Sequence, residues 1–76
     1  MHIDQVLDAS GLNCPLPLLR AKKTLAGMSA GQLVKILATD PGAARDFEVF
    51  AKQTGHELLE SGEEDGKFKF ILRKGS

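Results

Sequence analysis

Tryptophan and tyrosine are absent from this chain of 76 residues, and cysteine occurs once. The usual aromatic anchors of a binding surface are therefore missing, and a disulfide within the chain is excluded. The sequence has no apolar run of about 18 residues, which argues against a membrane-spanning helix. Charges of both signs balance to a formal net charge of +0, so nothing indicates a general affinity for nucleic acid.

What the chain does have is the composition of a small folded domain. Hydrophobic residues make up 42% of it and charged residues 26%, a balance typical of globular proteins. A chain of this length has room for one hydrophobic core, so we expect residues 1–76 to form a single domain. The N-terminus does not resemble a secretion signal, and we expect a cytoplasmic location, where thiols stay reduced.

Apolar periodicity divides the chain into a series of short strands and helices. Strands are expected in short apolar-rich runs between turn residues, and helices where apolar residues recur every three or four positions. These patterns predict strands at residues 3–8, 33–38, 56–61 and 67–73, and helices at residues 15–25 and 41–54. The order βαβαββ implies a parallel first pair of strands and a closing antiparallel hairpin. The predicted fold is an α/β two-layer sandwich, with a mixed four-stranded sheet and two helices on one face.

The second predicted helix has boundary signals at both ends. Asp40 is expected to cap its start, with Pro41 as the first helical residue. Gly55 suits the left-handed conformation that commonly follows a helix. The acidic run at residues 63–65 is most simply explained as part of a solvated hairpin turn. Asp40 is also a weaker candidate for a binding role, because it ends a strand and ligand sites in α/β sheets favour such ends.

The single cysteine, Cys14, directly precedes Pro15, Leu16 and Pro17 at the predicted start of the first helix. With Cys14 as the N-cap, a thiolate would face the positive end of the helix dipole and the amide of Leu16. This placement predicts a thiol pKa below the usual value of about 8.5. It also predicts an exposed, nucleophilic sulfur at a rigid junction between a loop and a helix. A small, buried and inert cysteine is the alternative.

No other residue completes a recognisable catalytic set. A lone histidine such as His56 at a strand start is more often structural, and His2 lies near the terminus. One cysteine and two histidines are too few and too dispersed for a zinc site, so neither a metal nor a cofactor is expected. A thiol peroxidase or disulfide oxidoreductase would need a second protein to supply the resolving thiol. What remains is a thiol that can accept a sulfur atom, hold it as a persulfide and pass it to a partner.

Residues 7–23, LDASGLNCPLPLLRAKK, resemble the Cys-Pro-x-Pro signature of the SirA/TusA-type sulfur-carrier proteins, and residues 38–41 and 54–58 resemble later segments of that family. The resemblance implies the two-layer βαβαββ fold. It also implies a cytoplasmic protein that relays persulfide sulfur from a cysteine desulfurase to an acceptor protein. By the same resemblance, Cys14 accepts the sulfur, while Pro15 and Pro17 hold the helix start. One branch of the family leads to 2-thiouridine in tRNA, others to molybdenum-cofactor enzymes or sulfur oxidation, and the motif does not distinguish them.

Two classes of function therefore remain open. The first is a monomeric sulfur carrier, a sulfurtransferase component rather than a stand-alone enzyme, with protein partners and no direct contact with nucleic acid or membrane. Arg20, Lys22 and Lys23 could then dock an acidic patch of a donor or acceptor, or simply keep a short helix soluble. The second is a non-catalytic regulatory or protein-binding module. A redox sensor that forms a mixed disulfide through Cys14 lies between the two.

Overall fold

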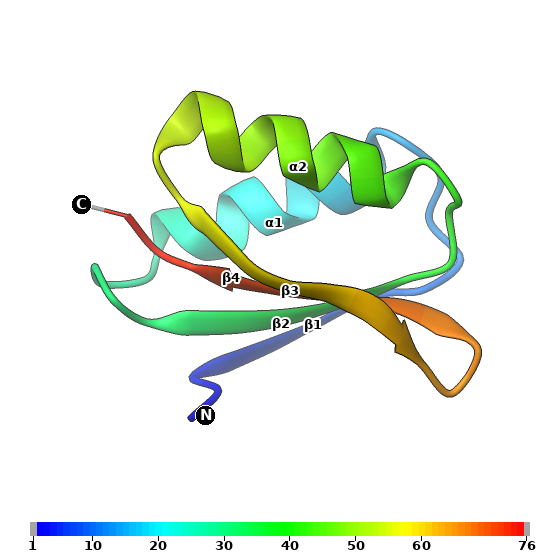
Figure 1. Ribbon diagram of the computed structural model, residues 1–76, viewed down its shortest axis with the longest axis horizontal. Helices are drawn as coiled ribbons and strands as arrows, with labels where there is room; N and C mark the ends of the chain where they lie inside the picture. Colours follow the sequence, from blue (N-terminus) through cyan, green and yellow to red (C-terminus); the bar gives the residue numbers. More distant parts are fainter. Residues whose placement is uncertain (1, 76) are drawn as a thin grey trace.

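Residues 2–75 are described by the computed structural model, which contains helices and strands in the predicted order. The sheet is formed by β1 (Gln5–Ala9), β2 (Leu33–Ala38), β3 (Glu57–Glu64) and β4 (Lys67–Arg73), and the helices are α1 (Leu16–Ala26) and α2 (Ala43–Thr54). Both helices cover the same face of the sheet (Figure 1), so the predicted two-layer α/β sandwich is confirmed. No helix in the described part of the chain is long and apolar enough to cross a membrane.

The four strands are ordered β1-β2-β4-β3 across the sheet. β1 runs parallel to β2, whereas β4 is antiparallel to both β2 and β3. The predicted mixed sheet is therefore confirmed, although β1 begins and ends later than the strand expected at residues 3–8. Because β1 and β2 are parallel, they end at the same edge of the sheet. The loops that follow them, residues 10–15 and 39–42, both lie at that edge and lead into α1 and α2.

The hydrophobic core lies between the helices and the covered face of the sheet. Phe47 of α2 and Phe70 of β4 are fully buried, with their ring centroids 4.9 Å apart. Ala21 and Leu25, one turn apart on α1, are buried in the same cluster. Burial of a large apolar side chain stabilises a fold by roughly 1.5–3 kcal/mol. These contacts hold both helices on the sheet with their starts at the same end of the molecule (Figure 1).

The start of α2 differs from the sequence prediction. The helix begins at Ala43 with Gly42 in the cap position, and no side chain makes a capping hydrogen bond. Asp40 is therefore not the cap, and Pro41 precedes the helix. Instead the main-chain carbonyl of Asp40 accepts a hydrogen bond from the Ala43 amide at 3.1 Å, so a backbone turn replaces the expected side-chain cap. Gly55 follows the helix with a φ of 79°, which confirms the predicted left-handed residue.

The hairpin between β3 and β4 has a longer first strand and a shorter turn than expected. Glu63 and Glu64 lie within β3 and pair with β4, so the acidic run is not a loop. The turn consists of Asp65 and Gly66, whose φ values of 52° and 78° match the two-residue turns that suit hairpins. The Glu64 carboxylate accepts hydrogen bonds from Lys35 Nζ at 2.7 and 2.9 Å. Pairing with β4 and this ion pair both favour continuation of the strand.

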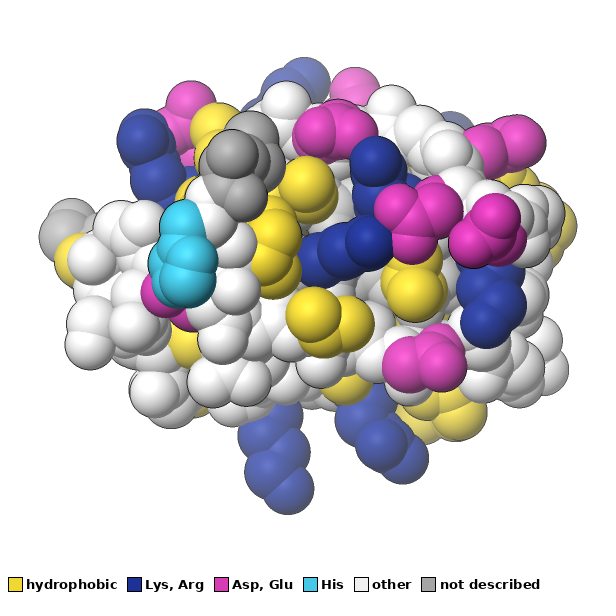
Figure 2. Space-filling model, turned by 90° about the horizontal axis from the view of Figure 1, so that it is seen from below, with side chains coloured by type: hydrophobic (Ala, Val, Ile, Leu, Met, Phe, Trp, Pro, Cys, Tyr) yellow, Lys and Arg dark blue, Asp and Glu magenta, His cyan; other side chains and the backbone are white. Residues whose placement is uncertain are grey.

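The second face of the sheet carries charged side chains around a small apolar centre (Figure 2). Ile71 of β4 is only 6% exposed, although it lies outside the main core cluster. Two ion pairs, Lys69–Glu60 and Arg73–Glu57, join the neighbouring strands β4 and β3, and a third, Lys35–Glu64, connects β2 to β3 across β4. Because charges of both signs are paired with one another, this face presents no field of a single sign.

Candidate functional site

Cys14 lies in the loop between β1 and α1, at the edge where the two parallel strands end. Its side chain is exposed, as predicted, and a buried inert cysteine is not observed. The amide of Gly11 in the same loop donates a hydrogen bond to Thr39 Oγ1, in the loop before α2, at 2.9 Å. Reactive groups in α/β sheets commonly lie beyond the carboxyl ends of the parallel strands. The thiol is thus exposed on a loop that is held in place.

The prolines delay the start of α1 by one residue. Pro15 occupies the cap position and the helix begins at Leu16, so Cys14 is not the N-cap that the sequence predicted. The peptide bond between Cys14 and Pro15 is cis. A residue before proline avoids the helical conformation, which explains why Cys14 stays outside the helix. The Leu16 amide, expected to face a thiolate, donates to the carbonyl of Asn13 at 2.8 Å.

The Cys14 thiol donates a hydrogen bond to the carboxylate of Asp46, with Sγ and Oδ2 2.7 Å apart. Asp46 lies in the first turn of α2, 32 residues further along the chain. This hydrogen bond raises the pKa of the Cys14 thiol above its usual value, because it forms only with the protonated group. Desolvation and the negative charges of Asp46 and Asp40 act in the same direction. The prediction of a lowered thiol pKa is therefore wrong.

Sequence reasoning missed Asp46 entirely. Nothing in the spacing of Cys14 and Asp46 indicates a contact, and an acidic residue in the first turn of a helix is common because the helix dipole stabilises it there. Asp40, the weaker binding candidate of the sequence, follows β2. Its Oδ2 atom is buried and has no hydrogen-bond partner among residues 2–75. The structure thus brings two carboxylates from the second βα junction toward the thiol of the first.

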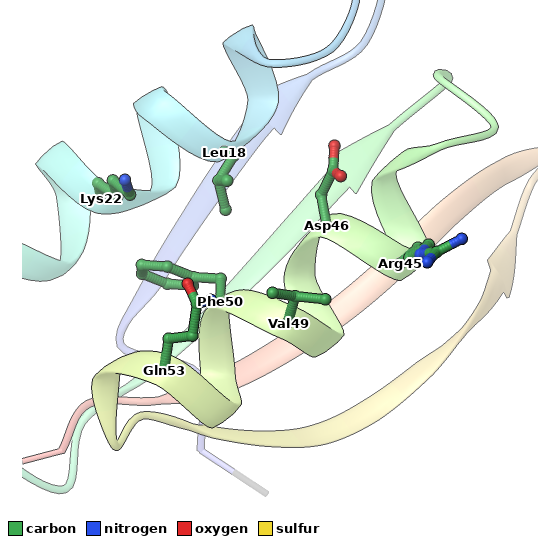
Figure 3. Close-up of a pocket in the computed structure, with 7 residues that line it drawn as sticks. All are labelled: Leu18, Lys22, Arg45, Asp46, Val49, Phe50 and Gln53. Carbon is green, nitrogen blue, oxygen red and sulfur yellow. The ribbon is translucent and has the colours of Figure 1, made fainter.

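A groove of 180 Å³ lies between α1 and α2, and Asp46 is part of its wall (Figure 3). Figure 3 shows Asp46 near the start of α2 and Gln53 further along the same helix. Lys22 approaches from α1, with its Nζ 5.9 Å from the ring centroid of Phe50. The groove is lined by Leu18, Lys22, Arg45, Asp46, Val49, Phe50 and Gln53. It therefore combines apolar surface with cations and ends beside the acceptor of the thiol hydrogen bond.

The three basic residues of α1 do not form one patch. Arg20, Lys22 and Lys23 are all exposed, but only Lys22 lines the groove. Arg20 and Lys23 are three positions apart and share a different side of the helix. Two apolar side chains at the start of the helix, Leu16 and Leu19, are also exposed, at 46% and 49%. They too are three positions apart, so they present apolar surface on one side of the helix start.

His56 has a structural environment away from the thiol. It follows α2, whereas Asp46 lies at the opposite end of that helix. Its Nδ1 atom accepts a hydrogen bond from the Gly75 amide at 2.9 Å, and its ring lies 5.5 Å from the ring of Phe50. Burial, with a smaller effect of Lys74, lowers the pKa of His56 and favours the neutral ring. The structure therefore does not place His56 as a base for Cys14.

Comparison with known proteins identifies the family. The family model described as Sulfurtransferase TusA matches residues 5–74. This chain belongs to the TusA family. It is 68% identical over 71 residues to the sulfur carrier protein TusA of Allochromatium vinosum, a match that covers 93% of each chain. It is 45% identical over 71 residues to the sulfur carrier protein TusA of Pseudomonas putida, covering 93% of this chain and 89% of that one.

A solved structure supports the same assignment. The crystal structure of a SirA-like protein from Desulfitobacterium hafniense matches the present fold with a TM-score of 0.82 at 31% sequence identity. The match covers 95% of this chain and 99% of that chain. The resemblance that the sequence indicated is therefore confirmed for both family and fold. The region matched to the TusA family includes both Cys14 and Asp46.

Proposed function

We propose that this protein is a sulfur carrier, in which Cys14 accepts persulfide sulfur from a cysteine desulfurase and passes it to an acceptor protein. The observation that carries the proposal is the position of the only cysteine, exposed at the sheet edge of a TusA-family chain. Two relatives of similar length are named sulfur carrier proteins. In this role residues 1–76 act as one carrier domain in the cytoplasm, as a component of a sulfurtransferase system rather than a stand-alone enzyme.

The proposed transfer is a substitution at sulfur. The Cys14 thiolate attacks the outer sulfur of the donor's cysteine persulfide, a new S–S bond forms, and the donor's S–S bond breaks. The donor cysteine leaves as a thiolate and takes up one proton, which balances the proton lost from Cys14. The sulfane sulfur keeps its oxidation state, so the step consumes neither an oxidant nor a reductant. A second substitution of the same kind hands the sulfur to the acceptor, without a metal or other cofactor.

A carrier of this kind must present one atom to two proteins in turn. Cys14 meets this requirement because it is exposed, and α1, which follows it, exposes the apolar side chains of Leu16 and Leu19. Arg20, Lys22 and Lys23 add positive charge to the same helix and would steer acidic patches of the donor and the acceptor. A monomer leaves this surface free for each partner, so we propose that the carrier works as a monomer. Pro15 and Pro17 hold the helix start by restricting the backbone next to the sulfur.

The direct test is the intact mass of the protein after incubation with a cysteine desulfurase and cysteine. A gain of one sulfur atom, about 32 Da, that reductant reverses is expected for a persulfide. The Cys14→Ser variant, which keeps a hydrogen-bonding hydroxyl, should fold normally and gain no mass. An unchanged mass of the wild-type protein, with Cys14 still open to alkylation, would contradict sulfur uptake from that class of donor.

For the final product we propose 2-thiouridine in tRNA, reached through further relay proteins and without direct contact between this carrier and the tRNA. The test is nucleoside analysis of tRNA from a strain that lacks its own carrier. The wild-type chain should restore 2-thiouridine, and Cys14→Ser should not. If the wild-type chain is loaded with sulfur on Cys14 but does not restore 2-thiouridine, the molybdenum-cofactor and sulfur-oxidation branches are the alternatives.

The groove between α1 and α2 is the observation that favours a second function, a non-catalytic regulatory or protein-binding module. Such a module would use Lys22 and the apolar groove to hold a partner, with no role for the sulfur. Cys14→Ser would then retain full partner binding, while charge reversal of Lys22 and Lys23 would abolish it. If Cys14→Ser still binds the partner protein but no longer transfers sulfur, the result favours the carrier over the binding module.

A further inference from the structure

We infer that Asp46 is a positioning residue that keeps the Cys14 thiol hydrogen-bonded and protonated in the free carrier, so that sulfur uptake is slow until docking to a protein donor breaks this bond. The inference rests on the proposed function, because it concerns the reactivity of the same thiol. It adds a restraint on that thiol which no motif in the sequence indicates.

The hydrogen bond requires a protonated sulfur. An ionised carboxylate can only accept a hydrogen bond, and the 2.7 Å between Sγ and Asp46 Oδ2 is a close donor–acceptor contact. If the thiol lost its proton, two negative groups would face each other at that distance. Like charges in contact repel each other, which disfavours the charged form of the sulfur. The arrangement therefore favours the thiol over the thiolate.

The charges that act on Cys14 come from the second βα junction. Asp46 contributes both the hydrogen bond and a negative charge, and Asp40 adds a second negative charge from the loop before α2. Both carboxylates act in the same direction. The Leu16 amide does not donate to the sulfur to oppose them, because it is already bonded to the Asn13 carbonyl. The folded protein thus holds its sulfur in the less reactive form.

The distance between the two side chains is set by the tertiary structure. The Asp46 amide donates to the Gly42 carbonyl at 3.2 Å, which places Asp46 in a formed first turn. The next residue, Phe47, is fully buried and holds α2 on the sheet. On the other side, the Gly11–Thr39 hydrogen bond connects the Cys14 loop to the loop before α2. The contact therefore joins two loops that are themselves held in place.

The consequence concerns the order of events in sulfur uptake. Only the thiolate is the nucleophile, so the Cys14–Asp46 bond must break before or as the sulfur attacks the donor persulfide. The Cys14 proton is released, the departing donor thiolate takes one up, and Asp46 ends in the protonation state in which it began. In the absence of a donor, the protonated thiol is protected from oxidants and from unwanted thiol–disulfide exchange.

The first experiment measures the rate of Cys14 alkylation by iodoacetamide across a series of pH values, followed by intact mass. Asp46→Asn should move the midpoint of the profile to lower pH and raise the rate at neutral pH. Each pH unit of displacement corresponds to about a tenfold change in the thiolate fraction. Asp40→Asn is the matched control: it removes a nearby charge but no hydrogen bond to the thiol, so its displacement should be smaller.

Superimposable profiles for wild type and Asp46→Asn would overturn the inference, and so would an equal displacement by Asp40→Asn. If Asp46→Asn does not fold, the same profile is compared between native wild type and wild type unfolded in urea. The native midpoint must then lie at the higher pH. A native midpoint at or below that of the unfolded chain would equally overturn the inference.

The second experiment separates this inference from the proposed function. Sulfur uptake at neutral pH is measured with glutathione persulfide, a small donor that cannot dock, and with a cysteine desulfurase. Asp46→Asn should accelerate uptake from the small donor and bring no such gain with the desulfurase, because docking already breaks the bond. An equal gain with both donors overturns the role of docking. A wild-type chain that neither donor loads contradicts the proposed function, while the alkylation profile still decides the role of Asp46.

Discussion

The Gly11 amide and Thr39 Oγ1 are joined by a hydrogen bond of 2.9 Å, which connects the loop that carries Cys14 to the loop that leads into α2. The two residues are 28 positions apart in the chain. They meet because β1 and β2 are parallel neighbours and their following loops leave the same edge of the sheet. By connecting the two loops, this hydrogen bond helps to hold the Cys14 thiol within hydrogen-bonding distance of Asp46.

Thr39→Val is expected to loosen the Cys14 loop. Loss of one hydrogen bond of this kind costs about 1 kcal/mol in the free energy of unfolding, which urea denaturation measures. The Cys14 alkylation profile should move to lower pH, because the Asp46 contact is held less firmly. Thr24→Val is the matched control, since Thr24 bonds the Arg20 carbonyl within α1. A shift in the thiol profile of the control, or none in Thr39→Val, would contradict this account.

Phe47→Ala should be the most damaging of the substitutions considered. The Phe47 ring is fully buried against Phe70, and its removal leaves a cavity that costs about 3–5 kcal/mol. Two residues further along α2, Val49 is 44% exposed, so Val49→Ala should change stability by less than about 0.5 kcal/mol. Chemical denaturation of the two variants measures this difference. If both variants lost a similar amount of free energy of unfolding, the packing of α2 on the sheet would not depend on Phe47.

The stability of the protein should fall in alkaline solution in a way that depends on Cys14. Because the pKa of the Cys14 thiol is raised in the folded state, its contribution to stability is complete below the pKa of the unfolded thiol, about 8.5. It is lost as the pH rises through the higher folded pKa. Denaturation of wild type and Cys14→Ser at pH values from about 8 to about 10 gives the free energy of unfolding of each protein. The advantage of the wild type over Cys14→Ser should decline as the pH rises.

Two comparisons sharpen the alkaline experiment. Lys69, whose pKa is raised by its hydrogen bond to Glu60, also loses its contribution as pH rises, but it is present in both proteins and cancels in the difference. The same comparison is made in the Asp46→Asn background, between the single variant and the double variant that also carries Cys14→Ser. The difference in free energy of unfolding between these two proteins should decline less with pH than the difference between wild type and Cys14→Ser. A difference between wild type and Cys14→Ser that does not change with pH would contradict a raised thiol pKa.

Charge reversal at Lys22 should slow sulfur uptake from a protein donor. Lys22 lines the groove that ends at Asp46, and a change of charge on a docking surface acts mainly on the rate of association and its salt dependence. Lys22→Glu should therefore lower the rate at low salt and flatten its dependence on ionic strength. Lys52→Glu, on the exposed side of α2 outside this groove, is the control. Equal effects of both variants would indicate a general effect of net charge.

Much of the fold follows from local features of the sequence. Every residue of a helix or strand points in a direction set by its position in that element. The buried side of α1 can therefore be predicted from the spacing of Ala21 and Leu25, and the burial of β2 from its apolar run. The element order, the mixed sheet and the exposure of Cys14 at a loop followed by proline could all be predicted from such signals. The left-handed Gly55 is another local feature that the structure confirms.

The chemistry of the site depended on contacts between residues far apart in the chain. Asp46 lies 32 positions from Cys14, and Lys35 lies 29 positions from Glu64. The sequence alone determined that one exposed thiol precedes a proline-restricted helix, because proline acts on its immediate neighbours. Only the tertiary structure decided the direction in which the pKa of that thiol is shifted. A pKa responds to whichever charges and hydrogen-bond acceptors packing brings within a few ångströms, and here packing brings two carboxylates toward the sulfur.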